Sequence, residues 1–212
     1  MRRGKFITLE GADGSGKSTQ AALLAEGLEN SGLDVTLTRE PGGAPGAEQI
    51  RSLLVEGETQ RWSPLSEALL HYAARREHMD KTILPALETG KWVISDRFAD
   101  STMAYQGFGH QLGRNQVARI HDVVVGGFAP DLTIIFDISV EEGLKRAASR
   151  TGNEDRYERM DKDFHARLCK GFLEIARQNP DRCAVIDALG EIAGIQILIL
   201  DLVKKRFELE LS

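Results

Sequence analysis

A glycine-rich run near the beginning of the chain has the residue types that bind phosphate groups. Residues 11–18 read Gly-Ala-Asp-Gly-Ser-Gly-Lys-Ser and match the pattern GxxxxGK[ST], directly after an apolar run and at the start of a helical pattern. The glycines let consecutive backbone N–H groups turn toward phosphate oxygens, Lys17 would reach the β- and γ-phosphates, and Ser18 would place its hydroxyl on Mg²⁺. A glycine-rich turn that binds nothing is the alternative, but the adjacent Lys17 and Ser18 favour a nucleotide site.

The dipeptide Asp96-Arg97 is a second feature suited to phosphate chemistry. It follows the apolar residues 92–94, so both side chains should lie at the carboxyl edge of a parallel sheet, where folds of this kind bind ligands. Arg97 could grip a phosphate through two hydrogen bonds, and Asp96 could order Mg²⁺ or its waters. A salt bridge at a strand end without further function is the alternative.

Five short apolar runs should form the strands that position these residues. Each run predicts a buried parallel strand, and the last is the weakest. They are Phe6–Leu9, Val35–Leu37, Trp92–Ile94, Leu132–Phe136 and Cys183–Ile186. Because long helical patterns separate them, the sequence predicts an α/β fold with a doubly wound five-stranded parallel sheet flanked by helices.

The helical patterns predict six helices and two loops. The first helix should begin near Lys17, end at the breaker of residues 30–32, and face the sheet with a stripe of Ala21, Leu24, Ala25 and Leu28. The others are expected over Ser66–Leu87, Arg114–Val125, Val140–Ser149, Asp161–Gln178 and Glu191–Phe207. Residues 39–46, with three glycines and two prolines, and the charged residues 150–159 are expected to be exposed loops.

Length and composition exclude several classes of protein. The chain has 212 residues, of which 42% are hydrophobic and 28% charged, and it has no repeated tract, so we expect one folded domain over residues 1–212. A formal charge of −5 gives no global attraction to nucleic acid or to anionic membranes. The apolar run Ile195–Leu200 is too short to span a bilayer. Cys169 and Cys183 lack zinc spacing, and we expect reduced thiols in a cytoplasmic protein.

A triphosphate site does not by itself identify a reaction, because the same loop serves switches, motors and metabolic kinases. A GTPase should carry an Asn-Lys-x-Asp segment and a DxxG switch after its next strand, and neither is found. A motor ATPase would normally be larger. A kinase for a small acceptor therefore fits better, and a regulatory NTPase is retained as the alternative from another class.

Further motifs occur in the order found in a known family. They are Glu10–Ser18, Thr38–Gly43, Tyr72–Arg75, Asp96–Phe98, Ser101–Gly107, Pro130–Thr133 and a basic run around Arg150. Each is a weak pattern alone, but together they cover almost the whole chain in one order and are specific. On these motifs the chain resembles the bacterial thymidylate kinases, which transfer the γ-phosphate of ATP to dTMP.

The resemblance implies roles for the residues around the two phosphate groups. Arg97 would hold the acceptor phosphate, Asp13 would contact the 3′-hydroxyl of the acceptor, and Ser18 and Asp96 would serve Mg²⁺. The implied catalytic residues are Lys17, Arg97, Arg150 and Asp13. The implied ATP contacts are Gly11, Ala12, Asp13, Gly14, Ser15, Gly16, Lys17, Ser18, Thr19, Arg146, Arg150 and Arg156.

The resemblance also implies a pocket for the thymine base. Arg75 would hydrogen-bond the base, and His71 stands where the family usually has a stacking Phe, which keeps a different small acceptor open. Taken without the resemblance, Arg75 could reach solvent from an apolar helix, and Tyr72 could belong to the core. Ser101 could be a helix cap, and Tyr105 could also be a core residue. The implied dTMP contacts are Asp13, Arg39, Glu40, Pro41, His71, Arg75, Arg97, Ser101, Thr102, Tyr105 and Gln106.

The charged segment 150–159 would be a lid in the resembled family. Such a lid closes over ATP and delivers arginines to the transferred phosphoryl group, with Arg150 favoured as the finger over Arg156 and Arg146. A solvated charged loop is the plainer alternative. The resemblance further implies ATP and dTMP as the only partners besides a second copy of the chain in a homodimer.

Overall fold

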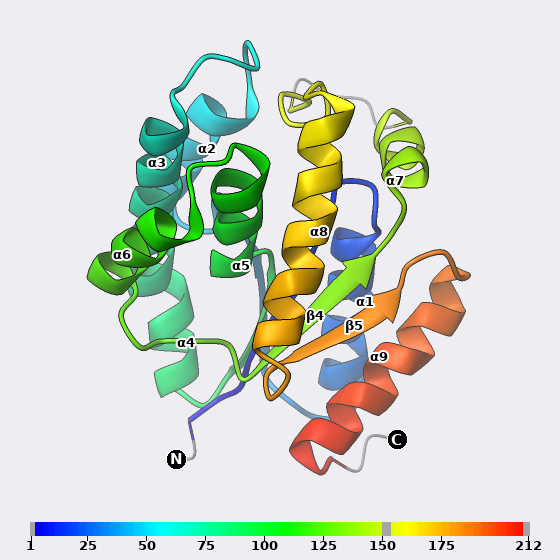
Figure 1. The fold of residues 1–212 in the computed structure, drawn as a ribbon. Helices are drawn as coiled ribbons and strands as arrows, with labels where there is room; N and C mark the ends of the chain where they lie inside the picture. Colours follow the sequence, from blue (N-terminus) through cyan, green and yellow to red (C-terminus); the bar gives the residue numbers. More distant parts are fainter. Residues whose placement is uncertain (1–2, 150–153, 210–212) are drawn as a thin grey trace.

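Five parallel strands form one sheet in the order β2-β3-β1-β4-β5 (Figure 1). The computed structural model describes residues 3–149 and 154–209. The strands are β1 (Phe6–Gly11), β2 (Val35–Arg39), β3 (Trp92–Asp96), β4 (Leu132–Asp137) and β5 (Cys183–Asp187). The predicted strands and the predicted α/β class are confirmed.

Helices cover both faces of the sheet. α1 and α9 pack together on one face, and α4, α5 and α8 pack on the other (Figure 1). The helices of the described residues are α1 (Lys17–Asn30), α2 (Pro45–Val55), α3 (Pro64–His78), α4 (Leu84–Glu88), α5 (Ala99–Thr102), α6 (Arg114–Val124), α7 (Val140–Ala147), α8 (Lys162–Gln178) and α9 (Ile192–Phe207), with π-helical turns η1 (Met79–Ile83) and η2 (Met103–Gly109).

Local sequence signals explain where several helices begin. The side chains of Ser63, Ser139 and Asp161 accept hydrogen bonds from backbone N–H groups in the first turns of α3, α7 and α8, respectively. Pro64 occupies the first turn of α3, where a backbone N–H is not needed. The helix expected over residues 66–87 is present, but the π-helical turn η1 divides it into α3 and α4.

The apolar runs form the core as their patterns predict. Every residue of β1 is buried, and the predicted stripe of α1, which includes Leu24 and Leu28, lies buried against the sheet. A second cluster, centred on Phe6, Phe98 and Tyr72, lies between β3 and the helices α3, α4 and α6. Tyr72 is therefore a core residue, as one of the two interpretations of its position proposed.

Expectations about exposure are wrong for residues 35–37 and 39–46, and also for Arg156, which is fully buried although residues 150–159 were expected to form an exposed loop. The strand expected to be buried at Val35–Leu37 is an edge strand, and Leu37 is 48% exposed, because β3 is its only neighbour in the sheet order. Residues 39–46 are not an exposed loop: Glu40 and Gly42 are buried, and the last two residues of this segment begin α2. Pro45 and Gly46 are typical of a loop, so the apolar pattern of α2 was not recognised. Proline is, however, also favoured at the start of a helix.

The register of the sheet aligns the ends of the strands that carry the candidate residues. Leu9 of β1 lies opposite Asp96 of β3, and Gly11 lies opposite Phe136 of β4. The glycine-rich loop after β1 and the Asp96-Arg97 pair after β3 therefore lie side by side. Both chemical motifs of the sequence are at the carboxyl edge of the sheet, as expected.

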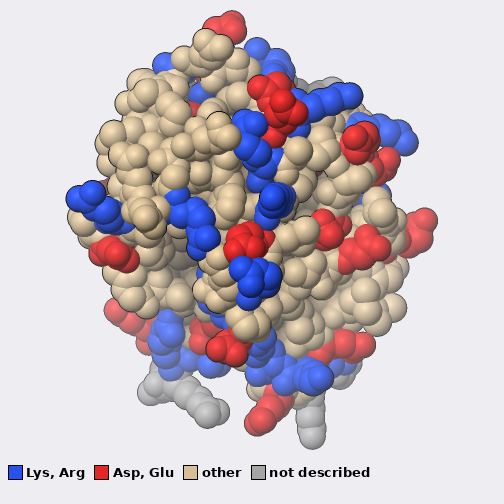
Figure 2. All heavy atoms as spheres, in the orientation of Figure 1, with Lys and Arg blue, Asp and Glu red and all other residues tan. Residues whose placement is uncertain are grey.

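The surface carries charges of both signs. Figure 2 shows Lys and Arg side chains interspersed with Asp and Glu on the face that it presents, without a continuous basic stripe there. No helix among the described residues combines the length and the apolar character needed to cross a membrane.

Candidate active site

A cavity of about 300 Å³ opens at the carboxyl ends of β1, β2 and β3. All eleven residues expected to contact the acceptor line it, together with Lys17, Ser18 and Asp96. Six further residues line it that sequence analysis did not single out: Arg51, Val55, Phe98, Glu154, Tyr157 and Glu158. The fold therefore gathers the acceptor set into one space, although its members come from widely separated parts of the chain.

The glycine-rich loop, residues 11–18, connects β1 to α1. Gly14 and Gly16 have φ angles of 77° and 91°, which are readily available only to glycine. A Cβ atom at Gly14 would lie 2.0 Å from the carbonyl oxygen of Gly143 on α7, so the absence of a side chain is required there. The loop thus packs against α7 at Gly14, and the backbone N–H groups after Gly14 lie at the start of α1.

Lys17 is buried within this loop. Its Nζ donates to the carbonyl oxygen of Ala12 at 2.7 Å and to Ser15 Oγ at 3.3 Å. Burial, with Arg97 nearby, lowers the pKa of Lys17 to about 8. An anionic phosphate beside this amine would favour its charged form, so the site is suited to a lysine that is protonated when a nucleotide is bound.

Ser18 and Asp96 form the feature expected to serve a metal ion. The Ser18 hydroxyl donates to Asp96 Oδ2, while Asp96 Oδ1 is buried without a hydrogen-bond partner among the described residues. No cluster of three or more His, Cys, Asp or Glu side chains suited to a metal occurs in the described part of the chain. A hydroxyl beside one carboxylate fits Mg²⁺, which keeps several waters and takes other ligands from phosphates.

Arg97 lies at the centre of the site in a strained backbone conformation. Its φ angle is 74°, a left-handed value that side chains other than glycine rarely adopt. Its Nη1 donates to the Gly11 carbonyl at 2.9 Å and to Ser101 Oγ at 3.0 Å. Its Nη2 donates to Asp13 Oδ1 at 2.6 Å and to the Tyr105 hydroxyl at 3.0 Å. Strain of this kind persists where surrounding contacts hold it, and it is common at functional sites.

Asp13 connects the phosphate loop to this arginine. Its other oxygen, Oδ2, accepts a hydrogen bond of 2.8 Å from the Tyr105 hydroxyl. Burial alone would raise the pKa of Asp13, but the charges of Arg97 and Lys17 outweigh it and lower the pKa below the usual 3.8. Asp13 is therefore an ionised acceptor of hydrogen bonds, placed between the two cations.

Glu10 holds the turn that carries Arg97. It is fully buried at the end of β1, and it accepts from the Phe98 N–H at 2.7 Å and from Ser101 Oγ at 2.5 Å. Burial, reinforced by the nearby Asp100 carboxylate, raises the pKa of Glu10 to about 8. Sequence analysis used Glu10 only as part of a motif, because nothing in the sequence indicates that its two oxygens accept hydrogen bonds from Phe98 and Ser101.

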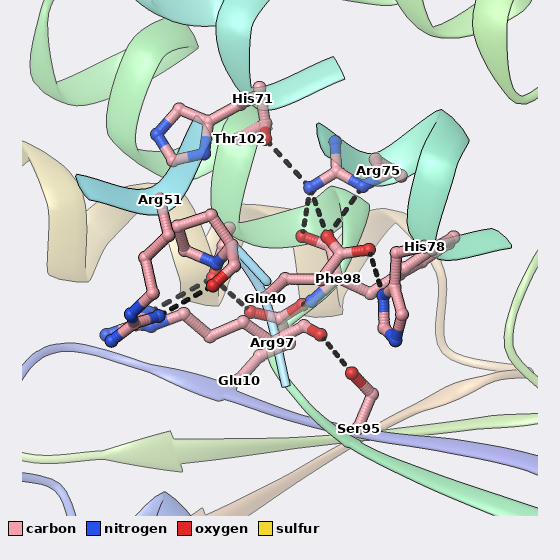
Figure 3. Close-up of polar contacts among 12 residues, drawn as sticks. Glu10, Glu40, Arg51, His71, Arg75, His78, Ser95, Arg97, Phe98 and Thr102 are labelled. Atoms are coloured by element: carbon pink, nitrogen blue, oxygen red, sulfur yellow. Dashed lines mark hydrogen bonds and ion pairs between the residues drawn. The ribbon is translucent and has the colours of Figure 1, made fainter. Parts of the chain in front are cut away.

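Glu40 and Arg75 form a buried ion pair with His78 beside it. Figure 3 shows Arg75 and His78 converging on the Glu40 carboxylate, with Arg75 Nε at 2.8 Å from Oε2 and His78 Nδ1 at 3.0 Å from Oε1. Arg75 also donates to the Phe98 carbonyl and to Thr102 Oγ1, both at 3.0 Å. Its remaining nitrogen, Nη1, is buried without a hydrogen-bond partner among the described residues. Arg75 therefore does not extend to solvent, and one of its donors is free for a ligand.

His71 lies one helical turn before Arg75 and lines the same cavity. Its Nε2 is 2.8 Å from the hydroxyl of Tyr157. Burial lowers the pKa of His71 to about 4, so the imidazole is neutral at neutral pH. A neutral ring in this position can stack on a base in the way expected of the family's Phe.

The three arginines expected near ATP differ in their placement. Arg150 lies outside the described residues. Arg146 Nε donates to Glu142 at 3.0 Å, and its Nη1 donates to the carbonyl of Ala188 at 2.9 Å. Arg156 is fully buried: it pairs with Glu67 at 2.5 Å and donates to the carbonyls of residues 54, 58 and 59. Neither Arg146 nor Arg156 lines the cavity in this structure.

Arg51 is the residue of the cavity wall that sequence analysis missed most clearly. It lies on α2, donates to the Pro41 carbonyl at 2.6 Å, and pairs with Glu154 through two hydrogen bonds of 2.9 and 2.6 Å. Arg51 and Arg97 line the same cavity, and both are labelled in Figure 3. Arg51 was not predicted because α2 itself was not predicted. A helix predicted to begin at Pro45 would have placed Arg51 on the same face as residues 47 and 48.

Comparison with known proteins gives consistent findings. A family described as thymidylate kinase matches residues 9–199. The thymidylate kinase of Caulobacter vibrioides is 51% identical over 209 residues, which is 99% of this chain and 100% of that protein. The thymidylate kinase of Dinoroseobacter shibae is 53% identical over 184 residues, or 87% and 88% of the two chains. The crystal structure of thymidylate kinase from Ehrlichia chaffeensis is similar with a TM-score of 0.77 and 39% identity, covering 95% of this chain and 99% of that one.

Proposed function

The chain belongs to the thymidylate kinase family, and from this premise we propose that it transfers the γ-phosphoryl group of ATP to dTMP, giving ADP and dTDP. One observation on this molecule supports the proposal: Asp13, Lys17 and Ser18 of the glycine-rich loop line the same cavity as the complete acceptor set, which includes Arg75 and Arg97. A donor site and an acceptor site that share one space can hold two phosphate groups in line, which is the main requirement of phosphoryl transfer.

Free polar atoms in the cavity wall support a pyrimidine base as part of the acceptor. Arg75 Nη1 is a buried donor, and Gln106 Oε1 is a buried acceptor, and neither has a hydrogen-bond partner among the described residues. Gln106 is oriented by its amide nitrogen, which donates to Glu67 Oε1 at 2.8 Å. Thymine offers a carbonyl oxygen and an N–H group on adjacent positions of its ring, so it can satisfy both atoms. Leaving such atoms unpaired is costly, which favours an acceptor with this pattern.

Cations around the cavity support the placement of the phosphates. Lys17 would contact the β- and γ-phosphates of ATP, and Arg97, with Arg51 and Arg39 also lining the cavity, would hold the acceptor phosphate. No covalent intermediate is required, because these residues stabilise the charge on the transferred oxygens and align the two reactants. Asp13 and Tyr105 would contact the sugar of dTMP, as the resemblance implies.

The proposal includes Mg²⁺ bound with ATP. Ser18 and Asp96 would hold the ion, and the buried, unpaired Asp96 Oδ1 supports this role. When bound, the ion neutralises charge on the β- and γ-phosphates. The protein residues keep the phosphates and the acceptor in position, and they exclude water from the space between them.

Acceptor-dependent release of ADP tests the function directly. We expect turnover with dTMP to exceed that with dUMP, dCMP, AMP, GMP, shikimate or no acceptor. Equal turnover with and without acceptor would instead favour a regulatory NTPase, and a preference for another acceptor would favour a sister kinase. The Arg97→Ala variant should lose dTMP turnover while it still binds ATP, and unchanged turnover would contradict the placement of the acceptor phosphate at Arg97.

We also propose that the protein acts as a cytoplasmic homodimer. Exposed apolar side chains on α2, α3 and α6, including Leu53, Leu69 and Val123, support an interface on these packed helices. Leu69 is 50% exposed and Val123 is 86% exposed. Sedimentation of the wild type and of Leu69→Glu would test this: the wild type should be a dimer, and the variant should shift toward the monomer. A monomeric wild type would refute the proposal.

A further inference from the structure

One wall of the cavity is formed by residues 154–160, a segment that packs against α3. Tyr157 of this segment lines the cavity, and its hydroxyl is 2.8 Å from His71 Nε2. The ring centroids of His71 and Tyr157 are 6.2 Å apart, with a tilt of 40°. The two rings therefore meet edge to edge through one hydrogen bond, and neither covers the face of the other.

Three residues of α3, spaced four apart, contact other segments of the chain around the cavity. Glu67 pairs with Arg156, His71 meets Tyr157, and Arg75 pairs with Glu40. Residues with this spacing lie on one face of a helix. Consecutive residues of the segment, Arg156 and Tyr157, are thus bound to consecutive turns of α3.

The Arg156 attachment is the more rigid of the two. Both Arg156 and Glu67 are fully buried. The guanidinium also donates to the carbonyls of Leu54, Glu58 and Thr59 at 2.9–3.0 Å, which ties the segment to the end of α2. Arg156 therefore fixes where the segment lies, but its side chain does not line the cavity.

Tyr157 connects the segment 154–160 to the residues expected to contact the acceptor. Its ring packs edge-on against Tyr105, with centroids 5.2 Å apart and an angle of 82°. The Tyr105 hydroxyl donates to Asp13 at 2.8 Å and accepts from Arg97 at 3.0 Å. A row of rings from His71 through Tyr157 to Tyr105 therefore connects α3 to the two residues at the centre of the site.

We propose that His71 and Tyr157 act as a positioning pair for the acceptor, because their hydrogen bond holds the Tyr157 ring against Tyr105 and makes α3 and residues 154–160 one rigid wall. This inference rests on the proposed function, since the wall faces the space assigned to dTMP. It also gives a physical reason for an imidazole at position 71: a phenyl ring could stack on a base, but it could not bind the Tyr157 hydroxyl.

The protonation states of the two groups suit this bond. Burial keeps the pKa of His71 near 4, and burial, together with the Glu67 carboxylate, raises the pKa of Tyr157 well above its usual 10. Both groups are neutral at neutral pH, so one N–H or O–H group donates and the other atom accepts.

A double-mutant cycle with His71→Phe, Tyr157→Phe and the double variant tests the pair. Each substitution keeps an aromatic ring and removes one partner of the hydrogen bond, and Tyr157→Phe also removes the interaction of the Tyr157 hydroxyl with Glu67. Calorimetric titration with dTMP should show each single variant weakened roughly two- to tenfold, the effect of one hydrogen bond. The double variant should be no weaker than Tyr157→Phe alone, because adding His71→Phe to that variant removes nothing further. The KM for dTMP should rise, and kcat should change little.

Hydrogen exchange of the ligand-free protein provides a readout that does not depend on the reaction. Amides of residues 154–160 should exchange faster in both single variants, by the same roughly two- to tenfold factor, with no further increase in the double variant. The control Tyr72→Phe removes a phenol hydroxyl from the core side of the same helix and should leave this exchange and dTMP binding unchanged.

The outcomes separate the positioning pair from the proposed function. Additive effects in the cycle, or exchange of residues 154–160 equal to wild type, would overturn the pair. If the exchange data show coupling but dTMP does not bind, the proposed function fails, and with it the role in acceptor positioning. Coupling in both measurements supports the inference.

Discussion

Replacing Glu40 with Gln should destabilise the protein strongly, although the two side chains have the same shape. Glu40 and Arg75 are 4% and 2% exposed at their side chains, and the Glu40 oxygen Oε2 is 2.7 Å from Arg75 Nη2. Glutamine would leave the buried guanidinium without a counter-ion. Removing one partner of a buried pair typically costs about 3–5 kcal/mol, which for a chain of this length corresponds to a fall in Tm of roughly 6–20 °C.

The pH dependence of this effect has a defined sign. Burial alone would raise the pKa of Glu40, but Arg75 and His78 outweigh it and hold the pKa below the usual 4.5. The stabilisation is therefore complete above pH 4.5 and is lost as pH falls through the lowered pKa of the folded state. The difference between the wild type and Glu40→Gln should be constant near neutral pH and should shrink in acid.

Urea unfolding at neutral pH measures the effect, with Asp80→Asn as the control. Asp80 pairs with Arg76 on an exposed helix surface, where both side chains are at least 40% exposed. Such a pair contributes under about 1 kcal/mol. A loss in Glu40→Gln no larger than that in Asp80→Asn would refute the reasoning that burial makes the Glu40–Arg75 pair indispensable.

Three other predictions concern the core of the site and the thiols. Because the pKa of Glu10 is raised to about 8, the stability that it contributes is complete below pH 4.5 and is lost as pH rises to about 8. The free energy of unfolding of Glu10→Gln, measured with urea, should therefore depend less on pH across this window than that of the wild type. Parallel pH curves would contradict this prediction. Gly14→Ala should weaken ATP binding, measured by calorimetry, far more than Gly16→Ala. Both variants force a left-handed backbone on alanine at a cost of about 1–2 kcal/mol, but only Gly14→Ala places a Cβ atom against Gly143. Equal losses of affinity would show that the close approach to Gly143 does not matter. Cys183, whose pKa burial raises to about 12, should resist iodoacetamide until the protein unfolds, as followed by mass spectrometry, and rapid alkylation of the folded protein would argue against its burial.

The sequence predicted the strands and most helices because these elements carry strong periodic patterns. Leu132–Asp137, for example, is apolar up to its last residue except for Thr133, and the structure buries all of it except Asp137. Edge positions were not predictable, because exposure of Leu37 depends on the order of the strands and not on β2 itself. The helix α2 was missed because its first two residues, Pro45 and Gly46, also suit a loop.

The site was predictable where motifs mark it and not where distant segments meet. The sequence motifs selected Arg75 and Arg97, which line the cavity. They did not indicate that Arg156 would be buried against Glu67. The two residues are 89 positions apart, and no local pattern marks Glu67 as a buried carboxylate that needs a cationic partner. Tyr157 was also overlooked, since its neighbour His71 was considered only as a stacking partner.

The strand order determines when β1 can pair with its neighbours during synthesis on the ribosome. β1 is the first strand to be synthesised, but its sheet partners are β3 and β4, so neither neighbour exists until residues 92–96 and 132–137 have been added. At typical translation speeds the first of these arrives on the order of ten seconds later. During that delay the apolar segment Phe6–Leu9 has neither of its neighbouring strands. The glycine-rich loop is thus the earliest part of the site to be synthesised, but the sheet edge that positions it forms only after β3 and β4 have been added.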